Sequence, residues 1–323
     1  MAALKIAVAD SPFPSLDPIR EVVSRIGGEV QLASEATPEA ILRVAKDADA
    51  VLVTYGQITG DIIRQLTKSR IISRMGIGTD NIDIEAATKA GMVVTKVPDY
   101  CIDEVSDHTM ALLLAVVRKI PFINAQVHGG MWKMPAVVPI HRLRGSVLGL
   151  MGFGQIPQLV TPKAKSFGLR VIAYDPYAPK KVFTRAGVES VDFSTLLKTS
   201  DYVSIHSPLV PETKHLFNGD AFRQMKGSAY LVNTARGPIV DEAALAAALD
   251  AGEISGAALD VMEKEPPGAV SPLYGRDNVI ITPHTSFYSE ESLVDLQTKA
   301  AEEVVAVLSG KAPRNPVNKV VLS

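Results

Sequence analysis

The chain has 323 residues, of which 47% are hydrophobic, with a formal net charge of −2 and a sequence pI near 6.3. This length predicts two domains with a sizeable buried core, and the balanced charge, without a Lys/Arg cluster, argues against a nucleic-acid partner. Cys101 is the only cysteine, which excludes an internal disulfide and a cysteine metal site, and we predict no metal site. The sequence shows no signal-peptide pattern, and its longest apolar run, at 110–117, is too short to span a bilayer. We therefore expect a cytoplasmic protein without a membrane partner.

Short apolar segments alternate with helix-like segments through the first hundred residues. We predict strands at 5–9, 30–32, 50–54, 71–74 and 92–95. The helix-like segments lie near 17–26, 38–46, 59–67 and 84–90. Such alternation predicts a parallel sheet covered by helices.

A second alternating region follows a long apolar helix, which is predicted at 104–118 and ends before Pro121. Residues 127–144 have no clear period, and we interpret them as a connection or an arm. The predicted strands beyond them lie at 147–151, 170–174, 202–206, 229–233, 256–259 and 279–282. The predicted helices lie at 155–167, 193–198, 241–251 and 290–308, the last of them amphipathic.

A glycine-rich turn follows the strand at 147–151. Gly152 would make the tight turn, and Gly154 would let the backbone approach a ligand, so that the next helix directs its N–H groups at a pyrophosphate. Pro157 stands where the GxGxxG pattern has a third small residue, so the motif alone leaves an ordinary glycine turn open. Proline is tolerated in a helix's first turn, so we predict a slightly displaced helix that still binds NAD, and a kink at Pro162. Asp175, about 20 residues beyond the glycines, would bind the adenosine ribose and repel the extra phosphate of NADP.

Three later strands are followed by side chains that can do chemistry: Arg236 after the first, the acidic residues Asp260, Glu263 and Glu265 after the second, and His284 after the third. Ligands bind at the carboxyl ends of strands in open parallel sheets. Reduction of a carbonyl by NADH needs a proton, which a histidine can supply, and a carboxylate would fix the histidine tautomer. A guanidinium would polarise the keto oxygen and clamp an adjacent carboxylate. Taken singly, Arg236 could equally be a surface ion-pair partner, and His284 a loop or capping residue.

The chain resembles the D-isomer-specific 2-hydroxyacid dehydrogenases along nearly its whole length. The similar stretches are 74–83, 152–157, 233–237, 259–266 and 283–285. Within the family it is similar to the branch that contains the C-terminal binding proteins, through 174–177, 283–290 and 316–319.

This resemblance implies a fold and an assembly. It implies an α/β protein of two doubly wound parallel-sheet domains, Rossmann-like or flavodoxin-like, with an active-site cleft between them. The substrate-binding domain would be discontinuous, formed by 1–103 and 288–323, and the NAD-binding Rossmann domain would span 104–287. The family also implies a homodimer.

The resemblance also implies roles for individual residues. Arg236 would bind and polarise the 2-keto acid, His284 would be the acid/base, and Glu265 its hydrogen-bonded partner. The substrate-binding residues would be Arg74, Ile77, Gly78 and Phe287, the last of which stands where the branch has Trp. The cofactor-binding residues would be Thr109, Gly152, Phe153, Gly154, Gln155, Ile156, Asp175, Ser207, Pro208, Thr213, Thr234, Ala235, Arg236, Asp260 and His284.

We therefore predict an oxidoreductase that acts on CH–OH groups, with NAD as cofactor and a small 2-hydroxy or 2-keto acid as substrate. Two alternatives remain open. One is an NAD(H)-sensing, corepressor-like interaction protein, and the other is a phosphite-type dehydrogenase on the same scaffold. The sequence does not name the acid.

Overall fold

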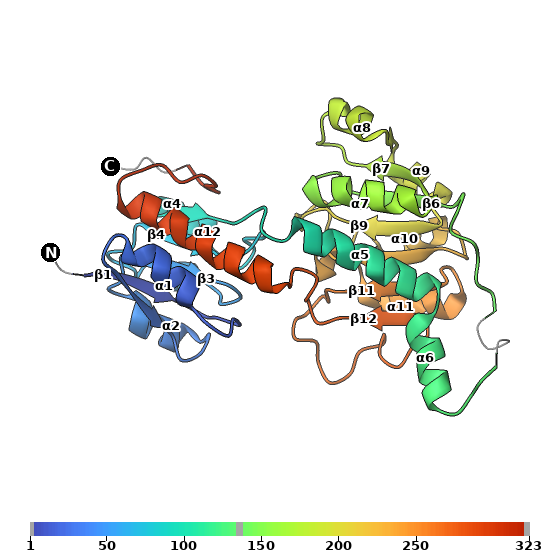
Figure 1. Ribbon diagram of the computed structural model, residues 1–323, viewed down its shortest axis with the longest axis horizontal. Coiled ribbons are helices and arrows are strands. Elements are labelled where there is room, and N and C mark those ends of the chain that lie inside the picture. The colour runs from blue at the N-terminus through green and yellow to red at the C-terminus, as the bar shows by residue number, and fades with distance from the viewer. Residues whose placement is uncertain (1–2, 134–137, 320–323) are drawn as a thin grey trace. The chain divides into compact units, whose positions relative to one another are not determined.

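The computed structural model of the protein describes residues 3–133 and 138–319 and divides into two compact units (Figure 1). Unit 1 comprises Met1–Tyr100 and Ser289–Ser323, and unit 2 comprises Cys101–Tyr288. The strands of each unit form one parallel sheet, five-stranded in unit 1 and seven-stranded in unit 2, which confirms the predicted fold class.

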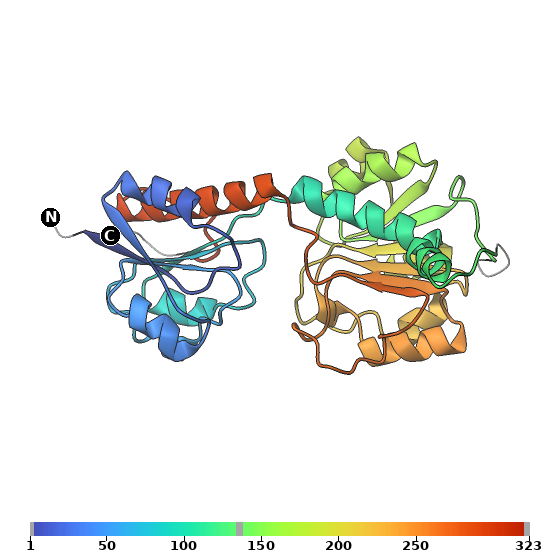
Figure 2. The same ribbon diagram turned by 60° about the horizontal axis from the view of Figure 1, so that its bottom comes forward.

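The sheet of unit 1 has the order β2-β1-β3-β4-β5, which is the flavodoxin-like doubly wound order. Its strands are β1 (Leu4–Val8), β2 (Gly28–Leu32), β3 (Ala50–Val53), β4 (Ile71–Arg74) and β5 (Val93–Thr95). One face is covered by α1 (Asp17–Ser24) and α12 (Glu290–Leu308), as Figure 2 shows. The other face is covered by α2 (Pro38–Ala45), α3 (Gly60–Ile63) and α4 (Ile84–Lys89).

Helix α12 joins unit 1 from the far end of the sequence. Its N-terminus is fixed by a capping box between Ser289 and Ser292, a feature that stabilises a helix by about 1 kcal/mol. The Ser73 hydroxyl on β4 donates to the Ala300 carbonyl at 3.0 Å, and Leu296 and Val304 are buried. The amphipathic helix predicted at 290–308 is confirmed as α12, and it packs on the sheet formed by strands within residues 4–95.

The sheet of unit 2 has the order β12-β11-β10-β9-β6-β7-β8, so that strand order reverses between β6 and β9, as in Rossmann folds. Its strands are β6 (Val147–Met151), β7 (Arg170–Tyr174), β8 (Glu189–Ser190), β9 (Tyr202–Ile205), β10 (Tyr230–Asn233), β11 (Gly256–Leu259) and β12 (Val279–Ile281). On one face lie α5 (Ile102–Val117), α7 (Gln155–Ser166) and α8 (Lys180–Ala186). On the other lie α9 (Phe193–Thr199), α10 (Gly219–Gln224) and α11 (Glu242–Ala251).

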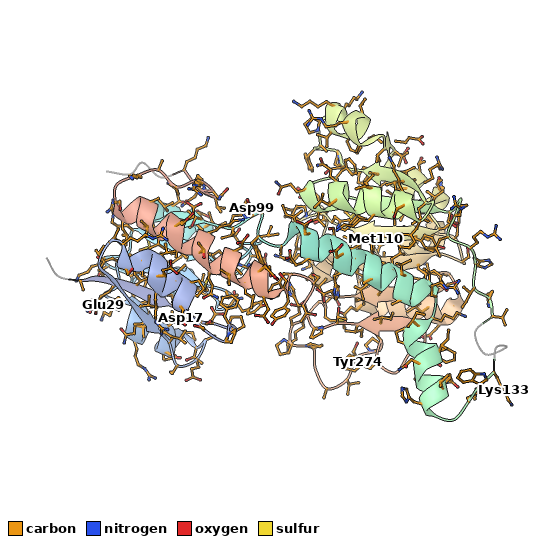
Figure 3. All side chains as sticks on the ribbon, viewed as in Figure 1. Asp17, Glu29, Asp99, Met110, Lys133 and Tyr274 are labelled. Atoms are coloured by element: carbon orange, nitrogen blue, oxygen red, sulfur yellow. The ribbon has the colours of Figure 1, made fainter. Side chains whose placement is uncertain are left out.

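Each face of this sheet has its own apolar core. Met110 on α5 (Figure 3) packs in the first core. In the same core Phe153 stacks on Phe183, with ring centroids 4.8 Å apart. Phe222 and Leu245 fill the second core. Charged side chains such as Asp17 and Glu29 of unit 1 are exposed instead. Because β6, β9 and β11 are buried on both faces, they are almost continuously apolar.

The structure contains short elements that the sequence analysis did not predict. After α5, Lys119 takes a left-handed conformation (φ 56°), and a new helix, α6 (Ile120–His128), begins with Pro121 in its first turn. Proline is favoured there because the first N–H groups of a helix have no intrahelical partner. Helices α8 and α10 and strand β8 were also missed, and only the start of the predicted helix at 59–67 is α-helical, as α3. Residues 134–137 of the predicted connection lie outside the described residues.

Among the described residues, no single helix is long and apolar enough to cross a membrane. Helices α5 and α6 together meet the requirement by length and composition, but they are bent by 58°. The side chains of Leu113 and Val116 on α5 are buried in the first core of unit 2.

Candidate functional site

The glycine-rich turn connects β6 to α7 in unit 2. Gly152 has φ 90°, and a Cβ at this position would lie 2.9 Å from the backbone nitrogen of Ser207, so no other residue fits without displacing the chain. Gly154 is the N-cap of α7, makes no side-chain capping bond, and would place a Cβ in open space. The turn therefore presents the positive end of a helix dipole to an accessible position.

Pro157 is the third residue of α7 and is buried. A proline at this position costs no helical hydrogen bond, because the N–H groups of the first turn have no intrahelical partner. The first backbone hydrogen bond of the helix runs from the Gln158 N–H to the Gly154 carbonyl at 3.3 Å, and the Gln158 side chain also donates to the Phe153 carbonyl at 3.3 Å and to the Gly154 carbonyl at 2.9 Å. Pro162 lies inside α7, which continues to Ser166. The predicted displacement and kink of this helix stay predictions.

Asp175, directly after β7, lies beside the glycine turn. Its Oδ2 accepts the Phe153 N–H at 2.8 Å, and its Oδ1 accepts the N–H groups of Tyr177 and Ala178 at 2.9 and 3.1 Å. These bonds fix the carboxylate in one orientation. Because an ionised carboxylate offers about four lone-pair sites, acceptor capacity is left for hydroxyl groups of a ligand.

The loop after β9 packs against the same turn and contains Ser207, Pro208 and Thr213. The Thr213 hydroxyl donates to the Pro208 carbonyl at 2.7 Å and accepts the Val210 N–H at 2.9 Å, so the loop is closed on itself. His206 begins the loop, and burial lowers the pKa of its imidazole to about 3. This histidine is therefore neutral at physiological pH and does not contribute charge to the turn.

Asp260, which follows β11, is a fully buried carboxylate. Its Oδ1 accepts the Thr282 hydroxyl at 2.5 Å and the Thr285 N–H at 3.0 Å, and its Oδ2 accepts the Ser286 N–H at 2.9 Å. His108 on α5 has its Nε2 3.2 Å from the Thr282 hydroxyl and 3.6 Å from Oδ1 of Asp260. The sequence analysis missed His108. The sequence did contain a pointer to His108, since its neighbour Thr109 was predicted to bind the cofactor.

The turn after β10 presents Arg236. Asn233, at the end of the strand and fully buried, accepts the Ala235 N–H at 3.0 Å and donates to the Arg236 carbonyl at 2.9 Å. The hydroxyl groups of Thr234 and Thr109 lie 3.0 Å apart, which brings together two predicted cofactor residues from separate elements. Asn233 had no predicted role, yet its side chain shapes the turn.

Glu265 and His284 are brought together, with 2.6 Å between Oε2 of the carboxylate and Nδ1 of the imidazole. The other oxygen of Glu265 accepts the Met262 N–H at 2.9 Å. His284 has a positive φ of 53°, and its N–H donates to the Asp260 carbonyl at 2.7 Å. A left-handed conformation at a residue other than glycine costs about 1–3 kcal/mol, which the surrounding bonds must offset. The Phe287 ring packs edge-on against the imidazole, with centroids 6.3 Å apart.

The pKa of the Glu265 carboxyl is set by burial and by the groups that contact it. Burial alone would raise the pKa of the Glu265 carboxyl. The hydrogen bond and charge of His284 oppose burial, helped by the Met262 N–H and by Arg236, and the net pKa is lowered. Glu265 is therefore ionised at neutral pH and can only accept a hydrogen bond, so Nδ1 of His284 carries the hydrogen.

The comparisons with known proteins identify the family. Residues 110–286 match the model described as "D-isomer specific 2-hydroxyacid dehydrogenase, NAD binding domain". The chain belongs to this family. It is 42% identical to the D-3-phosphoglycerate dehydrogenase of Methanocaldococcus jannaschii over 94% of this chain and 58% of that protein, and 38% identical to the glyoxylate reductase of Thermococcus litoralis over 90% and 89%. The structure of D-lactate dehydrogenase with NAD+ from Lactobacillus jensenii has a TM-score of 0.81 at 27% identity, covering 98% of this chain and 100% of that chain.

The chain spans about three-fifths of the length of the archaeal phosphoglycerate dehydrogenases it matches. The relatives also carry different substrate names, so family membership does not select a substrate.

The geometry of unit 2 fits the dinucleotide of this family. The uncapped N-terminus of α7 and the open space at Gly154 suit a pyrophosphate, and the fixed carboxylate of Asp175 suits a ribose. Asp260 has three donors on its carboxylate and can accept one more hydrogen bond, such as that of an amide. These positions follow β6, β7 and β11, which end at the same edge of the parallel sheet.

Arg74, Ile77 and Gly78 belong to unit 1. Arg74 is the last residue of β4, and its Nη1 donates to the Met75 carbonyl at 2.9 Å. Ile77 and Gly78 follow in the next loop, so the structure groups all three at the carboxyl end of one strand. Their role toward a substrate stays a prediction.

Proposed function

We propose that the chain is an NAD-dependent D-2-hydroxyacid dehydrogenase, an oxidoreductase that interconverts a small 2-keto acid and its D-2-hydroxy acid. The observation that carries this proposal is the 2.6 Å pair of Glu265 and His284, on turns that also hold the buried Asp260. Membership of the family supports it.

The proposed chemistry divides between the cofactor and the chain. Bound NAD(H) supplies or takes up the hydride. Arg236 polarises the keto group and pairs with the substrate carboxylate. His284 donates a proton from Nε2 to the developing alkoxide, and Glu265 holds the imidazole in the required tautomer through Nδ1. In the direction of oxidation, His284 takes up the hydroxyl proton.

The remaining predicted residues complete this proposal. Arg74 and the backbone of Ile77 and Gly78 bind the substrate carboxylate, and Phe287 forms an apolar wall beside the imidazole. In this scheme residues 1–103 with 288–323 bind the substrate, and residues 104–287 bind NAD. The cofactor-binding residues of the scheme are those given in the sequence analysis, from Thr109 to His284.

The test is NADH oxidation by the purified chain with a panel of 2-keto acids. The names of the relatives suggest glyoxylate and the keto acids that correspond to D-lactate and D-3-phosphoglycerate. We expect turnover of at least one acid. If the chain binds NADH but turns over none, an NAD(H)-sensing interaction protein is favoured. If only phosphite reduces NAD+, a phosphite-type dehydrogenase is favoured.

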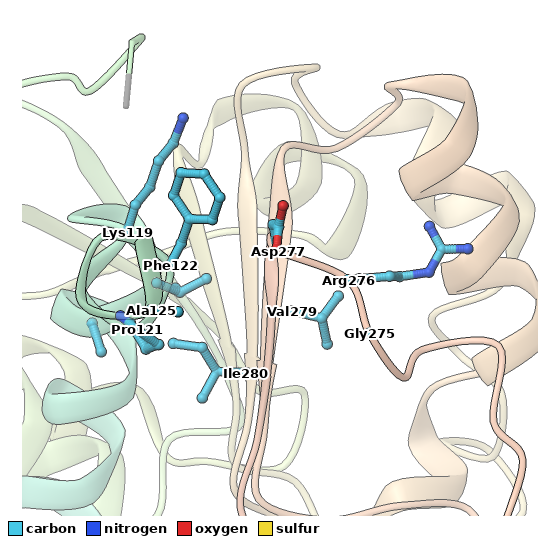
Figure 4. Close-up of a pocket in the computed structure, with 11 residues that line it drawn as sticks. Lys119, Pro121, Phe122, Ala125, Gly275, Arg276, Asp277, Val279 and Ile280 are labelled. Atoms are coloured by element: carbon cyan, nitrogen blue, oxygen red, sulfur yellow. The ribbon is translucent and has the colours of Figure 1, made fainter. Parts of the chain in front are cut away.

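We further propose that the chain forms a homodimer through the region around α6. Ile120 and Trp132 are 54% and 86% exposed. A cavity of about 250 Å³ lies between Lys119 and Phe122 on one side and Asp277 and Val279 on the other (Figure 4). This cavity is at the amino end of β12, the opposite end of the strand from His284. Light scattering should report twice the chain mass, and Ile120→Asp should shift it to the monomer. A monomeric unmodified chain would contradict the dimer and leave the catalytic proposal standing.

A further inference from the structure

The turn that carries Glu265 is held by residues outside the catalytic pair. The Glu263 N–H donates to Oε1 of Glu242, the first residue of α11, at 2.5 Å. The Glu263 carboxylate is hydrogen bonded to Nε2 of His215, which lies in the loop before α10. Both contacts involve residues for which the proposed chemistry has no use.

The same turn packs directly on the residue after Arg236. A Cβ on Gly237 would lie 1.9 Å from the Met262 carbonyl oxygen and 2.5 Å from the Glu263 nitrogen. The Met262 N–H is also the donor to Glu265. The Met262–Glu263 peptide is therefore enclosed between the Arg236 turn on one side and the Glu242 and His215 side chains on the other.

His215 is tied to the Arg236 turn by its backbone as well. It has φ 49°, and its N–H donates to the Pro238 carbonyl at 2.8 Å, within the 3-10 turn Gly237–Ile239. Among the described residues, only Lys119, His215 and His284 combine a positive φ with a side chain. Two of these three are the histidines that bind the acidic turn, so both sites use a strained backbone to aim an imidazole at a glutamate.

We propose that His215, Glu242 and Glu263 form a clamp that positions the Met262–Glu265 turn, and thereby sets Glu265 and His284 relative to Arg236. His215 and Glu242 are positioning residues, because they act through Glu263. This proposal rests on the proposed function for its catalytic consequence, but the clamp itself can be measured without turnover.

The charges around the clamp make His215 necessary. Three carboxylates face one another here, those of Glu242, Glu263 and Glu265, and the cationic or titratable groups that face them are His215, His284 and Arg236. Burial, together with the charges of Glu263 and Glu265, raises the pKa of Glu242 against the opposing Glu263 N–H bond. A hydrogen bond from His215 to Glu263 offsets part of this repulsion and keeps the turn closed.

The first experiment replaces Glu242. Glu242→Gln keeps an oxygen that can accept the Glu263 N–H, whereas Glu242→Ala removes it. We expect Glu242→Ala to lower kcat by roughly tenfold with an unchanged KM, since small misplacements of catalytic groups are costly, and Glu242→Gln to restore most of the loss. Asp250→Ala is the matched control, because Asp250 lies at the other end of α11 and pairs with Arg276. Equal effects of Glu242→Ala and Asp250→Ala would overturn the clamp.

The second experiment replaces His215 and Glu263. His215→Asn retains tolerance of the left-handed backbone but cannot reach Glu263 as the imidazole does, and Glu263→Gln removes the charge. If the two residues act together, the double variant should lose no more activity than the more severe single variant. The pH profile of kcat/KM should shift in each of the two single variants. Additive losses would contradict a shared role.

A third readout separates this proposal from the proposed function. Amide hydrogen exchange of residues 260–265 should be at least tenfold faster in Glu242→Ala and His215→Asn than in the unmodified chain, with Glu242→Gln and Asp250→Ala unchanged. Faster exchange in a chain that turns over no 2-keto acid would retain the clamp and reject the enzyme. Unchanged exchange in an active chain would reject the clamp alone.

Discussion

Two turns of unit 2, at 152–154 and at 260–266, contain different kinds of chemical group. The turn at 152–154 relies on backbone: a positive-φ glycine, an uncapped helix end, and N–H groups that bind Asp175. The turn at 260–266 relies on ionisable side chains, namely Asp260, Glu263 and Glu265 with their histidine partners. The first arrangement suits binding that is insensitive to pH, and the second suits proton transfer, which needs groups that titrate. Substitutions in the first turn should therefore affect stability or NADH binding, and substitutions in the second should affect turnover.

The largest effect is expected at the second turn. His284→Ala should lower turnover by roughly 10²–10⁴-fold, the usual contribution of a positioned acid/base. NADH binding, followed by calorimetry, should be retained, because the glycine turn is untouched. Turnover close to that of the unmodified chain would remove His284 from the mechanism.

Replacements in the glycine turn should instead lower stability or the affinity for NADH. Gly152→Ala places a Cβ 2.9 Å from backbone atoms at φ 90°, so we expect a loss of about 1–3 kcal/mol in stability and a lower melting temperature. Gly154→Ala, with no atom within 4 Å of the new Cβ, should keep its melting temperature and yet bind NADH more weakly. An unchanged NADH affinity in Gly154→Ala would show that the pyrophosphate does not approach this position.

A smaller change is expected at Asp175. Asp175→Ala removes the carboxylate that would repel a ribose phosphate, so the preference for NADH over NADPH should fall by about tenfold. This change corresponds to roughly 1.4 kcal/mol in the free-energy difference between the two cofactors. Steady-state kinetics with both cofactors measure this ratio. An unmodified chain that prefers NADPH would contradict the assignment of NAD.

The smallest effect concerns pH. The lowered pKa of Glu265 means that its pair with His284 stabilises the fold fully above the ordinary glutamate value of 4.5, and that this contribution is lost as the pH falls through the lowered value. Urea unfolding of the unmodified chain and of Glu265→Gln should therefore differ at pH 7 and converge in acid. A difference that grows as the pH falls would have the wrong sign.

The sequence predicted the features that depend on local pattern. The apolar strands predicted both sheets, and the strand ends pointed to Arg236, to an acidic stretch and to His284, because parallel strands end at one edge of a sheet. Within the acidic stretch, the family resemblance singled out Glu265. It did not predict Gln158, His108 or Asn233, whose side chains bind backbone or partners that only the folded chain brings near. Helix α6 was missed because Lys119 must adopt an uncommon left-handed conformation before Pro121 can begin a helix.

The clamp residues were not predicted for the same reason, since only the folded chain brings them near their partners. Glu242 looks like an ordinary acidic residue in the first turn of a helix, and His215 like a loop residue. Only tertiary contacts direct them to Glu263. Glu263 itself lies within the stretch 259–266 that resembles the family, but spacing alone did not separate its role from that of Glu265.

The central claim is the reduction of a 2-keto acid to the D-hydroxy acid. The most direct measurement is NADH oxidation by the purified chain with the panel of 2-keto acids, followed by chiral chromatography of the product. We expect at least one acid to be reduced, with the D enantiomer as the product and with turnover lowered by roughly 10²–10⁴-fold in His284→Ala. An L product, or no oxidation of NADH with any acid, would contradict the proposal.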